Sequence, residues 1–167
     1  MNTGEQTRLI RAMMDFDSGD PKRIQHFIKV WAFAKMIGES EGLDPDTLFT
    51  LETAAIVHDI GIHACEEKYG HTGGKQQEIE GPPLAEALLK DLGYDPSVIR
   101  RVSWLVGHHH TYTDVRDLDH QILLEADFLV NSFEDEMSTA EIESFRQKVF
   151  RTPSGIRLLK LQYSLPG

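Results

Sequence analysis

The sequence lacks most features of secreted and membrane-spanning proteins. Cys65 is its only cysteine, which excludes an intrachain disulfide and makes a reducing cytosol the simplest setting. No stretch approaches the roughly 18 consecutive apolar residues that a membrane span needs. The first residues contain no apolar run of the signal-peptide type. We therefore expect a cytoplasmic protein with no membrane partner.

Positive charge is also scarce. The chain has 17 lysines and arginines against 27 aspartates and glutamates, which gives a formal net charge of −10, and its basic residues form no stripe. Because nucleic-acid binding depends on clustered Lys and Arg, we expect no nucleic-acid partner. A small anionic substrate is still compatible with this charge, since a bound cation can reverse the field inside a pocket.

The sequence is rich in signals for the starts of helices. A residue whose side-chain oxygen can cap a helix precedes proline at Asp20-Pro21, Asp44-Pro45, Asp95-Pro96 and Thr152-Pro153. No segment alternates apolar and polar residues as a half-buried strand would. Helices are predicted near 4–16, 21–41, 45–60, 82–92, 96–109, 119–133, 139–150 and 153–162. The prediction is an all-α fold, a compact single-domain bundle of seven or eight helices spanning residues 1–167.

Residues 62–80 break this pattern. They are polar, contain glycines and are too long for a simple helix connection. Loops of such length in a compact domain are usually functional or disordered. Because this segment directly follows His58-Asp59, we expect it to be a functional loop.

Several apolar helical stripes contain or end in a side chain that can bind a metal. His26, His58 and His109 lie on three predicted helices, and Asp127 lies on a fourth. A single histidine on such a stripe is more often a hydrogen-bonded core residue. A buried aspartate is costly without a cation or several donors, which applies to both Asp59 and Asp127. One shared metal site, built where facing helices converge, explains these residues better than a separate structural role for each of them.

These residues resemble the HD-domain superfamily of metal-dependent phosphohydrolases. Its pattern is a histidine on an early helix, a His-Asp doublet on the next and a later aspartate. Here the pattern falls on His26, on His58-Asp59 within AAIVHDIG and on Asp127 within EADFLV. The resemblance covers roughly residues 20–135 and leaves 136–167 as a C-terminal helical addition.

The resemblance implies an HD-domain-like fold and a phosphohydrolase activity. His26, His58, Asp59 and Asp127 would hold a divalent ion, and His58 and Asp59 would act in catalysis. Nitrogen and oxygen ligands suit manganese, iron, cobalt, nickel or zinc, with one or two ions per chain. The expected reaction is hydrolysis of a nucleotide-like ester or a small phosphomonoester by metal-activated water. No feature of the sequence specifies an oligomeric state.

A second metal site is the least settled part of the pattern. Many two-metal members carry another histidine after the doublet and one or two more before the final aspartate. Glu80 stands at the first of these places, and His108 and His109 match the later ones, whereas His110 is expected to be exposed. His71 is a further candidate from the predicted loop. The second site survives in altered form or is lost, and these residues then contact phosphate instead. The charge of Glu80 would repel phosphate, which favours a metal.

Two other interpretations stay open at this point. Some relatives with this ligand set use two irons and dioxygen to oxidise their substrates, and Glu80 with His108 could complete such a site. A non-catalytic module could also keep the fold to bind a nucleotide or a protein. The intact ligand set argues against that module, because a degenerate domain has no reason to keep buried carboxylates.

Overall fold

The computed structural model describes residues 3–167, and in that range the chain forms helices and no strand. The helices are α1 (Thr3–Phe16), α2 (Pro21–Ser40), α3 (Pro45–Val57), α4 (Ile62–Tyr69), α5 (Gly74–Asp91), α6 (Pro96–Val106), α7 (Leu118–Glu134), α8 (Thr139–Val149) and α9 (Pro153–Tyr163). The predicted all-α class is confirmed. None of these helices has both the length and the apolar character that crossing a bilayer requires.

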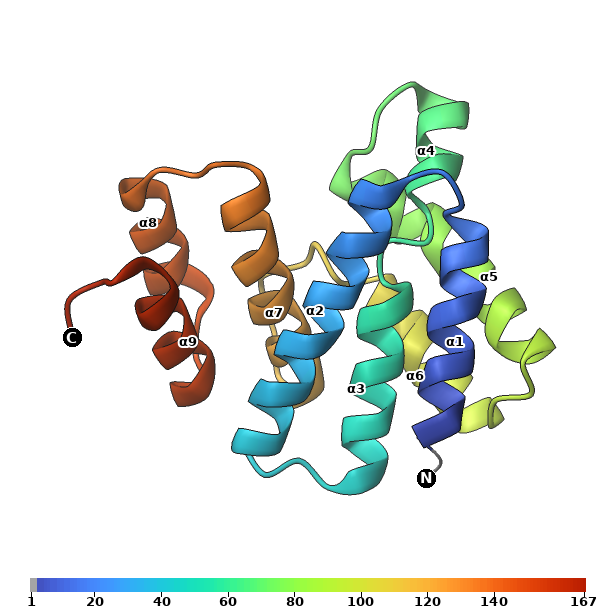
Figure 1. Cartoon of the computed structure of the whole chain (residues 1–167), viewed down its shortest axis with the longest axis horizontal. Coiled ribbons are helices and arrows are strands. Elements are labelled where there is room, and N and C mark those ends of the chain that lie inside the picture. The colour runs from blue at the N-terminus through green and yellow to red at the C-terminus, as the bar shows by residue number, and fades with distance from the viewer. Residues whose placement is uncertain (1–2) are drawn as a thin grey trace.

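Helices α2, α3 and α7 form the centre of the molecule. Helix α2 packs against both α3 and α7, and α3 also contacts α1, α6 and α7. Figure 1 shows α5 and α6 beside one another, and α8 and α9 on the side of α7 away from α1. The core between the central helices consists of fully buried aliphatic side chains, among them Val30, Leu51, Ile56, Val102, Leu105 and Leu123.

The predicted helix starts are confirmed at all four proline positions. The side chains of Asp20, Asp44, Asp95 and Thr152 each accept a hydrogen bond from a backbone N–H in the first turn of α2, α3, α6 and α9. These bonds satisfy donors that a helix start otherwise leaves unpaired. The start of α2 matters most here, because it fixes the turn that carries His26.

The predicted loop at residues 62–80 is wrong, because most of it is helical. Helix α4 ends at Tyr69 and is capped by Gly70, whose φ of 73° suits a glycine, and α5 begins at Gly74 and continues through Pro82 and Pro83. Prolines inside a helix and closely spaced glycines are ordinarily breaking signals, which is why the sequence pattern misled.

Two glycines explain why the chain nevertheless packs this way. A Cβ on Gly61 would lie 2.8 Å from the backbone nitrogen of Gly81, so α5 approaches the end of α3 more closely than side chains would permit. This close approach brings α5 beside His58-Asp59. It also buries Gln77, which is only 6% exposed.

Candidate metal centre

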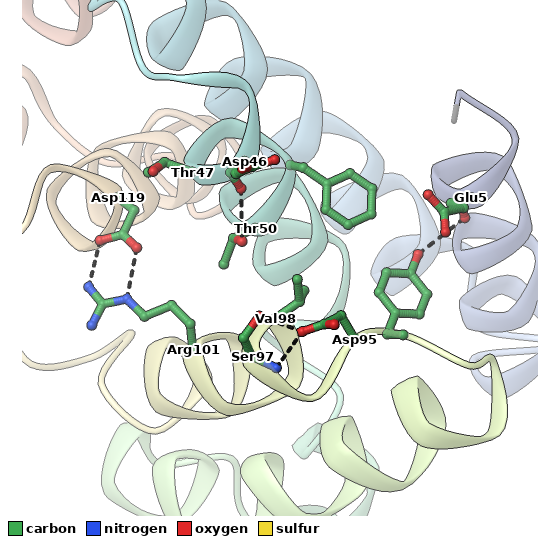
Figure 2. A pocket seen from close by; sticks show the side chains of 11 residues that line it. Glu5, Asp46, Thr47, Thr50, Asp95, Ser97, Val98, Arg101 and Asp119 are labelled. Carbon is green, nitrogen blue, oxygen red and sulfur yellow. Dashed lines mark hydrogen bonds and ion pairs between the residues drawn. The ribbon is translucent and has the colours of Figure 1, made fainter. Parts of the chain in front are cut away.

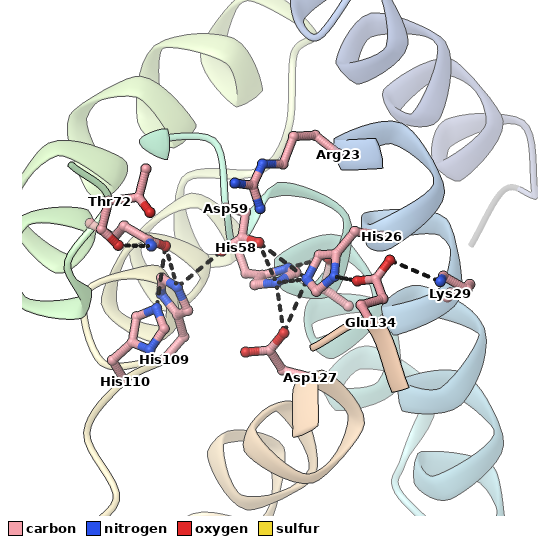
Figure 3. A network of polar contacts seen from close by, with 12 residues as sticks. Arg23, His26, Lys29, His58, Asp59, Thr72, His109, His110, Asp127 and Glu134 are labelled. Atoms are coloured by element: carbon pink, nitrogen blue, oxygen red, sulfur yellow. Dashed lines mark hydrogen bonds and ion pairs between the residues drawn. The ribbon is translucent and has the colours of Figure 1, made fainter. Parts of the chain in front are cut away.

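The four core residues of the predicted site come together between the three central helices. His26 lies on α2, His58 directly follows α3, Asp59 is the next residue, and Asp127 lies on α7. His26, His58 and Asp127 are buried, and Asp59 is partly exposed. Figure 3 shows the two imidazoles side by side, with Asp59 and Asp127 on opposite sides of them.

The ligand atoms of this group lie at short and similar distances. His26 Nε2 is 3.1 Å from Asp59 Oδ2, 3.1 Å from Asp127 Oδ1 and 3.3 Å from His58 Nε2. His58 Nε2 is 3.4 Å from Asp59 Oδ2 and 3.3 Å from Asp127 Oδ1. Ligands about 2.1 Å from one ion are separated by roughly 3.0–3.4 Å at octahedral or tetrahedral angles. Each carboxylate therefore has the spacing of a coordination shell to the two imidazole nitrogens. The group whose ligand atoms all lie within 4.8 Å of one another is His26, His58 and Asp59, with Asp127 on the opposite side of the imidazoles.

The other nitrogen of each imidazole is committed to an oxygen outside the group. His58 Nδ1 donates to the carbonyl of Ala55 at 2.7 Å, and His26 Nδ1 donates to Glu134 Oε1 at 2.5 Å. A neutral imidazole with its proton on Nδ1 has a lone pair on Nε2. Both lone pairs consequently face each other and two carboxylates. Such a group needs cations to hold it together, either protons or a metal ion.

The charges of these residues also indicate that the group requires a cation. Burial by itself lowers the pKa of His26, but hydrogen bonds to Asp127 and Asp59 raise it to about 10. Burial by itself raises the pKa of Asp59, but the charge of His58 and the hydrogen bond to His109 hold it well below its usual range. Carboxylates that stay ionised at this depth attract a cation strongly. The residues therefore fit a divalent ion.

A second group of possible ligands faces the other oxygen of Asp59. Asp59 Oδ1 lies 3.3 Å from Nε2 of His109, which is fully buried. Ligand atoms of Asp59, His109 and His110 lie within 4.8 Å of one another, as do those of His26, His58 and Asp59. Asp59 therefore stands between two groups, with one oxygen toward each, as a bridging carboxylate does.

Gln77 completes this second group. Its Oε1 lies 3.3 Å from His109 Nε2 and 3.2 Å from His110 Nε2. The amide orientation is fixed from the other end, because Gln77 Nε2 donates to the carbonyl of Thr72 at 2.8 Å. His109 Nδ1 donates to the carbonyl of Val106 at 2.7 Å, so His109 Nε2 has a lone pair in the neutral ring. That lone pair faces two oxygens, an arrangement that again suits a cation.

Three residues predicted for the second site lie elsewhere. Glu80 accepts hydrogen bonds from Lys68 (2.8 Å) and Tyr69 (2.7 Å) instead of facing Asp59. His108 stacks on Trp104 with ring centroids 3.9 Å apart. His71 is exposed, and its Nδ1 accepts from the backbone of Gly73. Of the predicted second-site residues, the structure brings only His109 to Asp59.

The sequence analysis missed Gln77, His110 and Glu134. His110, expected to be exposed, is half-buried, and burial together with the neighbouring charge of His109 lowers its pKa to about 4. A neutral His110 at ordinary pH is suited to metal binding. Glu134 could have been predicted from its spacing, because it lies seven residues after Asp127 and therefore on the same face of α7. Gln77 had none, since its helix was not predicted.

A cavity of about 390 Å³ opens onto Asp59 and Asp127. Lys22 and Arg23, from the first turn of α2, contribute positive charge to its lining, and neither forms an ion pair within residues 3–167. In Figure 3 the side chain of Arg23 extends from the start of α2 toward the side of the group on which Asp59 lies. The lining also includes the carboxylates of Glu134 and Asp135, so Lys22, Arg23 and a bound metal ion are the groups that could receive an anion there.

A larger hollow of about 660 Å³ lies among α1, α3, α6 and the start of α7. Its one cation, Arg101, is already paired with Asp119 at 2.7 Å, as Figure 2 shows. The rest of its charged lining is acidic, namely Glu5, Asp46, Asp95 and Asp119. Neither metal-capable group of residues 3–167 reaches it. Size alone does not make it a site for an anionic substrate.

Comparison with known proteins agrees with this arrangement. The family model of the HD domain matches residues 23–132, the segment that holds His26, His58, Asp59 and Asp127. The crystal structure of a predicted HD superfamily hydrolase from an uncultured Thermotogales bacterium superposes with a TM-score of 0.65 at 27% identity, over 97% of this chain and 85% of that one. No curated protein matches the chain. The matched segment and its ligand residues show that the chain belongs to the HD domain family.

Proposed function

We propose that this protein is a metal-dependent hydrolase of phosphate esters that uses a water molecule as its nucleophile. The observation that supports this most is that Nε2 of His26 and Nε2 of His58 each lie 3.1–3.4 Å from an oxygen of Asp59 and from an oxygen of Asp127. The similarity to a predicted hydrolase of the same superfamily supports the reaction class. The substrate is a nucleotide-like ester or another small phosphomonoester.

The residues divide the work of such a reaction. A divalent ion bound here would lower the pKa of a water molecule and neutralise charge on the phosphate. Asp59, the most accessible of the four core residues, is placed to orient that water. Lys22 and Arg23 line the same cavity and can hold the phosphate oxygens. Glu134 keeps His26 in the tautomer that binds metal, as a carboxylate behind a histidine ligand commonly does.

The geometry favours two ions over one. Asp59 Oδ2 faces His26 and His58, while Asp59 Oδ1 faces His109. Gln77 Oε1 adds a neutral oxygen to the second group. Two ions sharing one carboxylate can stabilise the attacking and leaving oxygens of a displacement together. The second ion is therefore proposed at His109, His110, Gln77 and Asp59, without Glu80 or His108.

The di-iron oxygenase alternative loses its specific support. It depended on Glu80 and His108 completing the second site, and both residues have other contacts. The neutral amide of Gln77 lies beside His109 in their place. The non-catalytic alternative still makes a distinct expectation, namely binding of a nucleotide without turnover.

The test is reconstitution of the metal-free protein. Protein stripped with a chelator is reloaded separately with manganese, iron, cobalt, nickel or zinc, and phosphate release is measured with p-nitrophenyl phosphate and nucleoside monophosphates. We expect release only in loaded samples, with one or two ions per chain by elemental analysis. Phosphate release that is unaffected by stripping would contradict the proposal. Substrate-dependent oxygen uptake in the iron sample would favour the oxygenase.

A further inference from the structure

The C-terminal addition contributes side chains to the cavity over the metal-capable residues. Helix α8 lies wholly outside the matched segment 23–132. Even so, Phe145 of α8 and Met137 of the preceding turn line the same cavity as Asp59 and Asp127. Two more aromatic residues, Tyr112 and Phe128, line it as well. We call Tyr112, Phe128 and Phe145 the aromatic wall.

The three rings of the aromatic wall pack directly against one another. The rings of Phe128 and Phe145 stack with centroids 3.7 Å apart and planes 1° apart. The ring of Tyr112 meets Phe145 edge-on, at 5.4 Å and 85°. Phe128 is 5% exposed, whereas Tyr112 is 42% exposed. The wall is thus anchored in the core and open at Tyr112.

Its position relates it directly to the reacting end of the cavity. Phe128 is the residue after Asp127 on α7, so one helix turn carries both a ligand and the base of the wall. Asn131 of the same helix also lines the cavity and adds a hydrogen-bonding amide. The cations Lys22 and Arg23 line the same cavity and are its candidates for holding a phosphate. A molecule that fills the cavity would therefore contact the cations, the metal-capable residues and the wall together.

We infer that the aromatic wall and Met137 form a subsite for a planar aromatic group on the leaving alcohol, so that the substrate is an aryl-bearing or nucleoside phosphomonoester. This inference rests on the proposed phosphohydrolase activity and adds its leaving-group specificity. Flat rings pack favourably on aromatic side chains and on the thioether of methionine. A volume of about 390 Å³ accommodates more than a bare phosphate. Helix α8 thereby has a role in substrate selection.

The experiment compares esters that differ in aromatic character. For the manganese-loaded protein, kcat/KM is measured with adenosine monophosphate and with ribose 5-phosphate, and their ratio is compared among variants. Tyr112→Ala should lower the ratio by roughly tenfold, the size of a lost base–aromatic stack. Tyr112→Phe should keep the ratio, because the ring remains. Phe133→Ala removes an aromatic ring that is 68% exposed outside the cavity, and it should leave the ratio unchanged.

A binding measurement separates this inference from the proposed function. Adenosine has no phosphate, so its affinity, measured by calorimetry against ribose as the matched probe, reports the wall without any turnover. We expect adenosine to bind more tightly than ribose and Tyr112→Ala to remove that preference. Equal binding of the two probes, or an unchanged kcat/KM ratio in Tyr112→Ala, overturns the inference while hydrolysis stands. Loss of all hydrolysis in the wild-type protein would instead overturn the proposed function.

Discussion

The two oxygens of Asp59 face two groups of imidazoles, and different kinds of neighbours hold the groups. His26 has the carboxylate of Glu134 behind it, which is itself paired with Lys29 at 2.9 Å. His109 has only a backbone carbonyl behind it, and the amide of Gln77 stands where a charged ligand would. A carboxylate behind a histidine raises its basicity as a ligand. The first group should therefore bind its ion more tightly than the second.

The packing of the two groups points the same way. His26, His58 and Asp127 come from the three central helices, which contact one another directly. His109 and His110 follow the end of α6 at Val106, and Gln77 lies in the first turn of α5. Ends of helices open more easily than their packed middles. We therefore expect two ions bound at these groups to differ in affinity, and substitutions in one group should change the binding of its ion more than that of the other.

The largest effect is expected from the residue that both groups share. Asp59→Ala removes a ligand from each group, so both ions and hydrolysis should be lost, with turnover down by at least about 10³-fold. The thermal stabilisation that added metal gives the wild-type protein should vanish as well. Elemental analysis, phosphate release and melting curves with and without manganese measure these effects. Asp91→Ala, an exposed carboxylate far along α5, serves as the control. Full metal content in Asp59→Ala would show that the shared-ligand arrangement is wrong.

A smaller effect should follow from changing the support behind the first group. Glu134→Gln keeps an acceptor for His26 Nδ1 but removes the negative charge, so affinity for the first ion should fall by roughly 10–100-fold. Competition with a chelating dye measures this affinity. Glu136→Gln makes the same chemical change at an exposed position on the following turn and should have no effect. Equal affinities in the two variants would mean that Glu134 is only a surface partner of Lys29.

The pH dependence distinguishes protons from metal in the first group. His26 has its pKa raised to about 10 without metal, chiefly by Asp127 and Asp59 acting against burial. Metal binding must expel that proton, so the affinity for the metal ion should rise by about tenfold per pH unit for each proton released, up to about pH 10.

The raised pKa of His26 also stabilises the metal-free fold. This contribution to the free energy of unfolding is fully present below about pH 6.5 and is lost as pH rises through 10. Competition with a chelator measures how metal affinity changes between about pH 6 and 9. Unfolding of the metal-free protein over the same range measures how its stability changes. A metal affinity that is independent of pH would contradict the prediction.

The first group was predictable from the sequence because its residues sit on regular helices. His26 and Asp127 share apolar stripes whose spacing follows the helical period, and His58-Asp59 ends such a stripe. Helix starts marked by Asp20 and Asp44 fixed the direction of those stripes. Buried carboxylates on such faces are costly without a cation or several donors, so the pattern, together with the family resemblance, predicted that these residues meet.

The second group was not predictable because its helix boundaries are hidden. Helix α5 runs through Pro82 and Pro83, which made its first two turns look like loop. Because the start of α5 was not predicted, Glu80 was expected beside the histidines of the second group. Gln77, three residues and almost one turn earlier on the helix, lies there instead. Helix α6 ends at Val106, so the histidines after it follow a turn, and His110 reaches the group while His108 stacks on Trp104. The arrangement depends on tertiary packing, such as the close approach of Gly61 and Gly81, which the sequence pattern does not reveal.

The finest test of the comparison changes the second group alone, through two positions on one helix. Gln77→Ala removes the amide oxygen 3.3 Å from His109 Nε2, so the second ion should be held about tenfold more weakly while the first is retained. Glu80→Gln, by contrast, alters a carboxylate that pairs with exposed Lys68, and metal content should not change. Titration with manganese, followed by elemental analysis at several concentrations, gives both affinities. A Gln76→Ala variant controls for loss of an amide beside position 77.

These two variants give opposite answers if the assignment is reversed. Loss of the second ion in Glu80→Gln, with Gln77→Ala unaffected, would mean that α5 shifts by about one turn when metal binds. If wild-type protein never exceeds one ion per chain, even in excess manganese or iron, the second group binds no metal. Gln77 would then hold His109 and His110 in place through the hydrogen bonds at 3.3 and 3.2 Å. In that case Gln77→Ala should slow turnover without altering metal content, and the first group would remain a single-ion centre.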